Sequence, residues 1–187
     1  MDQVFFQSTD ELTTEIVESG IVTWNDLVRS VQNFHYQRNS NRFDLELVWK
    51  ERKGTCSSKH AFLKHIAELN NIPNVKLILV FYKMDGQNTP GIEQVLKAHS
   101  LNYIPEAHCY LKCNNEILDI TNVNSNVENY SNSIIETKEI ESVDVIENKI
   151  LWHRQYLETW MKECKIEMTL DELWFIREKC IQALEIK

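Results

Sequence analysis

Residue types that can act together on a carbonyl group occur in the order Cys, His, Asp, at Cys56, His108 and Asp119. Cys56 follows Gly54 and begins a segment with helical periodicity, so we expect it at a helix start, where backbone N–H groups and the helix dipole favour an anion. Together with a nearby imidazolium, such a position lowers a thiol pKa from about 8.5 to roughly 3.5–7.5. We also expect Gly54 to let the backbone approach a substrate closely. Cys56 is therefore a candidate nucleophile, and the alternative is a buried structural cysteine.

A predicted hairpin relates the histidine to the aspartate. Two β-rich segments flank Asn114 and Asn115, residues that tolerate a tight turn. With the turn at these asparagines, cross-strand partners have position numbers that sum to 229, which places His108 opposite Thr121 and Tyr110 opposite Asp119. Alternation puts these four side chains on one face of the hairpin. Asp119 is then diagonal to His108, where a carboxylate can orient an imidazole.

The segments that must position these residues have recognisable signals. A helix is expected after Thr23, a second from Cys56 until Pro73 disfavours it, and a buried strand follows over residues 75–82. Helices are expected again over residues 142–164, and after the capping-box sequence at residues 169–172. This order predicts an α+β fold.

The composition favours one compact domain. Of the 187 residues, 43% are hydrophobic, with only four Gly and three Pro, so the chain can bury a substantial core. We expect a single domain over residues 1–187, with its core at about 24–122 and a C-terminal helical part at about 142–187.

Two stretches resemble the transglutaminase-like superfamily of the papain-like cysteine protease clan. KGTCSSKHAFLKHIAELNNIPNVKLILVFYKM is similar to its Gly-x-Cys, helix, Ile-Pro turn and central strand, and AHCYLKCNNEILDIT is similar to its His and Asp-x-Thr strands. The resemblance implies a transglutaminase-like, papain-like core with the nucleophile helix packed on an antiparallel sheet, and additional C-terminal helices. It also implies that Cys56 is the nucleophile, His108 the general base and acid, and Asp119 the orienting carboxylate.

The resemblance further implies acyl transfer through a thioester intermediate, on a peptide or a small amide or acyl substrate. Water as acceptor makes the protein an amidase or peptidase, an amine makes it a transglutaminase, and an arylamine makes it an acetyltransferase. We expect hydrolysis, because water needs no second pocket. The family has a second oxyanion donor upstream of the cysteine, besides the backbone N–H of Cys56, and the candidates here are Tyr36, Gln37 and Trp49.

Side-chain donors for a substrate cluster shortly before the nucleophile. A polar loop in this otherwise acidic chain carries Arg38, Asn39, Asn41 and Arg42, which are suited to a carboxylate or a carbonyl-rich substrate, and Tyr110 is a further candidate. The alternative is a turn whose arginines pair with Asp44 and Glu46.

Two other interpretations use the same residues differently. A zinc site would draw on Cys56 with His60, or on His108 with Cys109 and Cys113, but alternation separates His108 from Cys109, and no CxxC or HExxH spacing occurs. A catalytically silent member would keep the fold and use its cleft for binding. We expect no metal and no cofactor.

The net charge and the cysteines limit which partners and which cellular compartment we expect. The 28 acidic and 20 basic side chains give a net charge of −8, which disfavours nucleic acid. Neither a signal segment nor a membrane span is predicted, so we expect a cytoplasmic protein with reduced thiols, Cys56 and four buried cysteines. The oligomeric state is not predicted.

Overall fold

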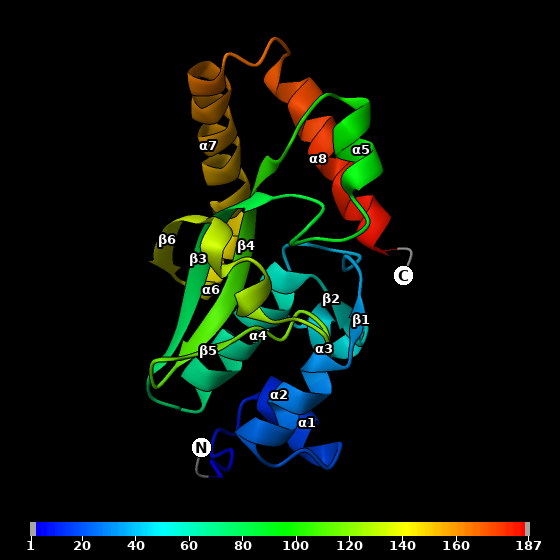
Figure 1. The fold of residues 1–187 in the computed structure, drawn as a ribbon. Coiled ribbons are helices and arrows are strands. Elements are labelled where there is room, and N and C mark those ends of the chain that lie inside the picture. Colours follow the sequence, from blue (N-terminus) through cyan, green and yellow to red (C-terminus); the bar gives the residue numbers. More distant parts are fainter. Residues whose placement is uncertain (1–2, 186–187) are drawn as a thin grey trace. The chain divides into compact units, whose positions relative to one another are not determined.

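The computed structural model describes residues 3–185 and has an α+β fold (Figure 1). In this part of the chain it contains eight α-helices, a two-stranded sheet, a four-stranded antiparallel sheet and two short 3-10 helices. None of the described helices combines the length and the apolar character needed to cross a membrane. The helices are α1 Glu11–Glu18, α2 Trp24–Gln32, α3 Leu47–Lys50, α4 Cys56–Leu69, α5 Glu93–Ala98, α6 Ser142–Glu147, α7 Lys149–Cys164 and α8 Leu170–Glu185. The strands are β1 His35–Tyr36, β2 Lys53–Gly54, β3 Val75–Met84, β4 Ile104–Cys113, β5 Glu116–Leu118 and β6 Ile134–Ile140, and the 3-10 helices are Val127–Asn129 and Ser131–Ser133.

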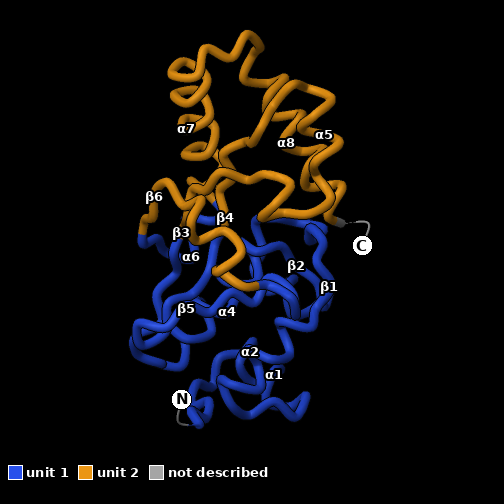
Figure 2. The backbone as a smooth tube through the Cα atoms, viewed as in Figure 1, with its two compact units in different colours: residues 1–78, 109–125, 139–146 blue, residues 79–108, 126–138, 147–187 orange. Residues whose placement is uncertain are grey.

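The chain forms two compact units, each assembled from three segments (Figure 2). Unit 1 contains residues 1–78, 109–125 and 139–146, and unit 2 contains residues 79–108, 126–138 and 147–187. Strands β3 and β4 therefore each contribute residues to both units. The single domain over residues 1–187, with its core at 24–122, stays a prediction.

Unit 1 is built around α4, which contacts α2 and α3. The predicted N-cap of α2 is confirmed, because the Thr23 side chain accepts a hydrogen bond from the Asp26 N–H. Helix α4 begins at Cys56 as predicted, and its N-cap is Thr55, whose side chain accepts a hydrogen bond from the Ser58 N–H. The core side chains of these helices are fully or nearly fully buried: Trp24, Leu27, Val31, Val48, Trp49, Ala61, Phe62, Leu63 and Ile66. Their burial fixes α4, and with it the position of Cys56.

The larger sheet has the strand order β5-β4-β3-β6, and its interior strand β3 is buried along most of its length, as predicted. The hairpin register is confirmed, since Leu111 pairs with Leu118 and Cys113 with Glu116. Asn114 and Asn115 have φ angles of 50° and 70°, the left-handed conformation that such a turn requires.

The expected extension of the hairpin as far as Asp119 and Thr121 is wrong, because β5 ends at Leu118. The reason lies in the hydrogen bonds of the next residues. The N–H of Ile120 donates to His60 instead of to β4, and Asp119 accepts hydrogen bonds from Thr121 two residues further on. The chain therefore leaves the sheet at Asp119 and turns toward α4.

Unit 2 contains α5, α7 and α8, and α8 contacts both other helices. The capping box before α8 is confirmed, because Thr169 and Glu172 exchange backbone and side-chain hydrogen bonds. The continuous helix predicted over residues 142–164 is wrong, since it is interrupted at Asn148, which separates α6 from α7. Asn148 has φ −110° and ψ −30°, away from regular helix geometry.

Candidate active site

Cys56 is the first residue of α4, as the sequence predicts, and its side chain is 8% exposed. A capping box closes the helix start, in which the Ser58 N–H donates to the Thr55 hydroxyl and the Thr55 N–H donates to the Ser58 hydroxyl at 2.9 Å. The Cys56 sulfur lies 3.6 Å from the Ser57 hydroxyl. The helix start thus holds the thiol where backbone N–H groups converge and an anion is favoured.

Gly54 is required by the packing of unit 1, and its expected approach to a substrate stays a prediction. A Cβ atom at this position would lie 2.9 Å from the Lys59 Cγ and 2.9 Å from the Ser58 hydroxyl. Real Cβ atoms essentially never come this close to other heavy atoms. Glycine is therefore required so that the aliphatic stem of Lys59 can pass beside β2.

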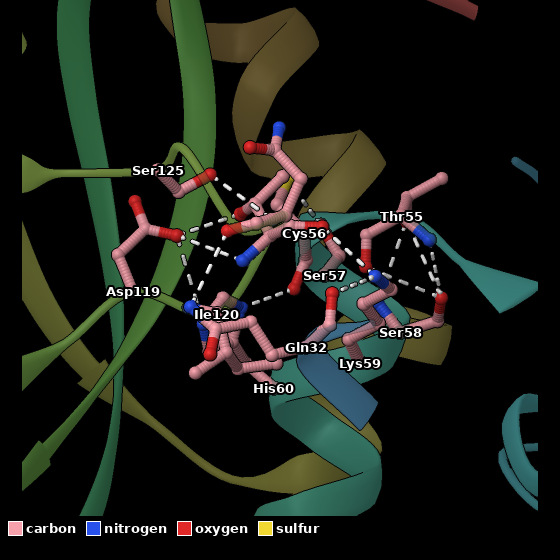
Figure 3. A network of polar contacts seen from close by, with 12 residues as sticks. Gln32, Thr55, Cys56, Ser57, Ser58, Lys59, His60, Asp119, Ile120 and Ser125 are labelled. Carbon is pink, nitrogen blue, oxygen red and sulfur yellow. Dashed lines mark hydrogen bonds and ion pairs between the residues drawn. The ribbon is translucent and has the colours of Figure 1, made fainter. Parts of the chain in front are cut away.

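His60 joins the helix start to the segment that carries Asp119 (Figure 3). Its Nε2 accepts the Ile120 N–H at 2.9 Å, so this nitrogen carries no proton, and the proton resides on Nδ1, which donates to the Cys56 carbonyl at 2.5 Å. His60 is fully buried and neutral. Both ring nitrogens are occupied by backbone groups, so His60 is suited to positioning and not to proton transfer with the thiol.

Lys59 makes a second connection between the same segments. Its ammonium donates to the carbonyls of Phe34 at 2.7 Å, Thr121 at 2.9 Å and Gln32 at 3.4 Å. Three acceptors match the three N–H groups of an ammonium, whereas a neutral amine has only two. Burial lowers the pKa of Lys59 to about 8, and an ionised Cys56 would oppose this shift. Lys59 is therefore a buried cation at neutral pH.

Asp119 lies on the segment that His60 and Lys59 hold. Its Oδ1 accepts hydrogen bonds from the Thr121 hydroxyl at 2.7 Å and the Thr121 N–H at 3.1 Å. The same oxygen is 3.8 Å from the His60 Nε2. Because that nitrogen carries no proton, the contact is not an ion pair. Two of the three predicted triad residues, Cys56 and Asp119, are thus brought to one region of unit 1.

His108 is half-buried and is the last residue of the segment 79–108, which belongs to unit 2. Its ring makes edge contacts with Tyr130, at a centroid distance of 5.2 Å, and with Tyr82, at 6.3 Å. These tyrosines restrict the imidazole within unit 2. Since Cys56 and Asp119 belong to unit 1, the pairing of His108 with either of them stays a prediction.

The three candidate oxyanion donors have different environments. Tyr36 pairs with Gly54 in the parallel β1–β2 ladder, and the Gln37 N–H donates to the Gly54 carbonyl, so both residues lie beside the strand that leads to Cys56. Trp49 is 1% exposed and packs against Arg52 and Phe34 in the core of unit 1. Because it is buried, Trp49 is a core residue. Tyr36 and Gln37 remain our candidates for the second oxyanion donor.

The polar loop before the nucleophile is largely held by its own hydrogen bonds. Asn39 donates to the carbonyls of Leu47 and Lys53 and to the Glu51 carboxylate, and hydrogen bonds from Ser40 and Asn39 lower the pKa of Glu51 to about 2. These hydrogen bonds give Asn39 a structural role in holding the loop against α3 and β2.

The other candidate substrate donors vary in exposure. Asn41 accepts the Phe43 N–H, and Arg42 donates to the Ile146 carbonyl instead of pairing with Asp44 or Glu46. Arg38 and Arg42 are exposed. Tyr110 is buried within β4, and burial raises the pKa of its hydroxyl, so it is not a surface donor.

The cysteines differ in environment, and all five are thiols. Cys109, Cys113 and Cys180 are buried as expected, and burial raises the pKa of Cys113 and Cys180 to about 11. The expectation that Cys164 is also buried is wrong, because Cys164 is the last residue of α7 and is exposed. Within residues 3–185, no group of three or more His, Cys, Asp or Glu side chains is arranged to hold a metal ion.

Two site residues, Lys59 and His60, were not predicted to position the nucleophile. The sequence does contain a signal for them, since a lysine and a histidine stand next to each other directly before the apolar run Ala61, Phe62 and Leu63. Searches for similar family models, curated proteins and solved structures found no match to the chain.

Proposed function

We propose that the protein is a transglutaminase-like thiol enzyme that hydrolyses or transfers an acyl group by means of Cys56, His108 and Asp119. The observation that carries the proposal is the docking of the Asp119 segment onto the helix start that presents Cys56, through Lys59 and His60. The confirmed hairpin register gives additional support, because it relates the strand of His108 to the segment of Asp119. A papain-like arrangement of helix and antiparallel sheet is part of this proposal.

In the proposed reaction, the Cys56 thiolate attacks the carbonyl carbon of an amide or acyl substrate. The oxyanion receives hydrogen bonds from the Cys56 backbone N–H and from Tyr36 or Gln37. His108 then protonates the leaving amine as the carbon–nitrogen bond breaks, which leaves a thioester on Cys56. Water attacks the thioester with His108 as base, and the thiolate is regenerated as the acid is released. Asp119 orients His108 in both steps.

The activated thiol is tested by alkylation with iodoacetamide over a range of pH, followed residue by residue with mass spectrometry. We expect the alkylation midpoint of Cys56 to lie at least one pH unit below the value of about 8.5 of an ordinary thiol. Exposed Cys164 is the internal reference. The midpoint is the useful quantity because it does not depend on how accessible each sulfur is. A Cys56 midpoint at or above that of Cys164 would refute an activated nucleophile.

The reaction class is tested by comparing wild type with Cys56→Ala on peptide, glutamine-amide and acetyl-donor substrates. We expect hydrolysis by the wild type and none by the variant. A catalytically silent binding module is the second candidate, and it is favoured by the low exposure of Cys56. An activated thiol without turnover of any of these substrates would support the silent module.

A further inference from the structure

Lys59 is a buried cation whose charge is held by dipoles. The side chain is fully buried, and its three acceptors are backbone carbonyls from two separate segments, residues 32–34 and Thr121. Carbonyl oxygens satisfy the N–H donors of an ammonium but carry no net charge. Among the described residues, Cys56 is a group whose ionisation would raise the pKa of Lys59. The ammonium therefore keeps its full positive charge, and this charge can stabilise a nearby anion.

Cys56 and Lys59 are three residues apart in the first turn of α4, a spacing that brings side chains to the same side of a helix. An ionised Cys56 would therefore lie close enough to the buried ammonium to raise the pKa of Lys59. Interaction between two titrating sites is reciprocal, so the ammonium must favour the thiolate to the same extent that the thiolate favours the ammonium. Burial strengthens this interaction, because little water separates or screens the charges.

The position of the ammonium is fixed from several sides. Gly54 leaves room for the aliphatic stem, and the Phe34 and Thr121 carbonyls hold the nitrogen. His60 holds the neighbouring segment through Ile120 (Figure 3). We propose that Lys59 is a positioning residue that stabilises the Cys56 thiolate from inside the protein. This inference deepens the proposed function by supplying a resident cation for the nucleophile, in addition to the helix start and His108.

The alternative role for Lys59 is a purely structural cross-link between α4 and the Asp119 segment. A structural cross-link affects folding but leaves the proton equilibrium of Cys56 unchanged. The two roles are therefore separated by the pH profile of the thiol and not by stability.

The first experiment compares Lys59→Met with Lys64→Met, a charge removal on the same helix at a lysine that pairs with Glu68. Iodoacetamide alkylation of Cys56 is followed by mass spectrometry from pH 4 to pH 10 for the folded proteins. For Lys59→Met we expect the alkylation midpoint to rise by about one pH unit, which lowers the rate at pH values below the midpoint roughly tenfold. For Lys64→Met we expect no shift. An unchanged midpoint in folded Lys59→Met would overturn the inference.

The second experiment needs no change at Lys59 and so remains decisive where Lys59→Met does not fold. The Lys59 ammonium is titrated by NMR through the chemical shift of its Cε, in wild type and in Cys56→Ser. Serine does not ionise in this range, so we expect the pKa of Lys59 to fall when the anionic partner is removed. Identical titration curves for the two proteins would show that the groups are not coupled, and the inference would be wrong.

The outcomes separate this inference from the proposed function. A wild-type Cys56 midpoint like that of an ordinary thiol refutes the activated nucleophile, whatever Lys59 does. A low wild-type midpoint that Lys59→Met leaves unchanged refutes the role of Lys59 and preserves the proposed function. A low midpoint that rises in Lys59→Met supports both.

Discussion

Both units bury charged side chains, but they compensate for the charge in different ways. In unit 2, the Arg177 guanidinium binds the Glu106 carboxylate with two hydrogen bonds, one of them 2.7 Å from Nε to Oε2. Burial alone would raise the pKa of Glu106, but Arg177 outweighs it and lowers the pKa to about 2. In unit 1, the acceptors of the buried Lys59 ammonium within residues 3–185 are three backbone carbonyls. The buried charge of Arg177 is neutralised by a carboxylate, whereas the buried charge of Lys59 is compensated by the dipoles of carbonyl groups.

The difference separates a structural ion pair from a charge that is available for chemistry. A buried cation with a bidentate carboxylate partner has its field cancelled at short range, so it fixes β4 to α8 and does little else. A cation held by dipoles remains a source of positive potential for a neighbouring thiol. The comparison therefore predicts large effects on stability in unit 2, and combined effects on stability and thiol chemistry in unit 1.

The largest expected effect is in unit 2. Glu106→Gln removes the buried carboxylate and leaves the Arg177 charge paired only with the less buried Glu178, so we expect a loss of about 3–4 kcal/mol in the free energy of unfolding. Urea unfolding followed by circular dichroism measures the loss. The control is Asp171→Asn, which breaks the exposed Arg154–Asp171 pair in the same unit and should have only a small effect. Equal effects of the two variants would contradict the distinction between buried and exposed pairs.

A pH-dependent loss of stability is expected next. Burial lowers the pKa of His153 to about 4, with Glu106 opposing and Arg177 assisting this shift, and the ring nitrogen Nε2 donates to the Pro105 carbonyl. Because the unfolded histidine titrates near 6.5, the unfolded chain binds a proton between about pH 6.5 and pH 4 that the folded protein does not.

The stabilisation by neutral His153 is therefore complete above about pH 6.5 and is lost as the pH falls through about 4, by on the order of 3 kcal/mol. Unfolding by urea at a series of pH values measures this slope. In His153→Gln, which has no titrating group but retains an N–H donor for Pro105, the slope over this range should flatten. A slope that is the same in both proteins would assign the pH dependence to other groups.

A smaller effect is expected at His60 in unit 1. His60→Leu keeps the bulk but removes the acceptor for the Ile120 N–H, and an unsatisfied buried N–H costs about 1–3 kcal/mol. Since His60 docks the Asp119 segment, turnover should also fall. The matched control is His65→Leu, because His65 is on the same helix but only half-buried. Unfolding free energy and activity are measured for both variants, and similar losses would show that docking by His60 is not specific.

The smallest expected effects compare two helix caps. Thr55→Ala and Thr169→Ala each remove an N-cap hydroxyl from a capping box, and each should cost about 1 kcal/mol in the free energy of unfolding. Only Thr55→Ala alters the helix start that holds Cys56, so only this variant should raise the Cys56 alkylation midpoint. Equal midpoints in the two variants would show that the capped helix start does not contribute to thiol ionisation.

Features that depend on neighbouring residues in the sequence were predictable. The hairpin register follows from two asparagines that accept positive φ angles, and the starts of α2, α4 and α8 follow from threonines that cap them. Each signal lies within a few residues of the structure it determines. The position of Cys56 at a helix start belongs to this class.

Features that depend on distant residues were not predictable. The end of β5 is determined by His60, which takes the Ile120 N–H from 60 positions away, and the role of Lys59 depends on carbonyls 25, 27 and 62 positions away. The need for Gly54 follows from the same contacts, because the stem of the Lys59 side chain that reaches these carbonyls passes beside it. Sequence patterns show that a lysine or a histidine is present, but its acceptors become known only when separate segments are brought together.

The interleaved segments have a consequence for the order in which the chain can fold during synthesis. The last segment of unit 1 ends at residue 146, before α7 and α8, which belong to unit 2. When residue 146 leaves the ribosome, every segment of unit 1 is present, whereas Glu106 still awaits Arg177. On a nascent chain, the nucleophile helix and the Asp119 segment can therefore assemble while a buried carboxylate of unit 2 has yet to meet its counterion.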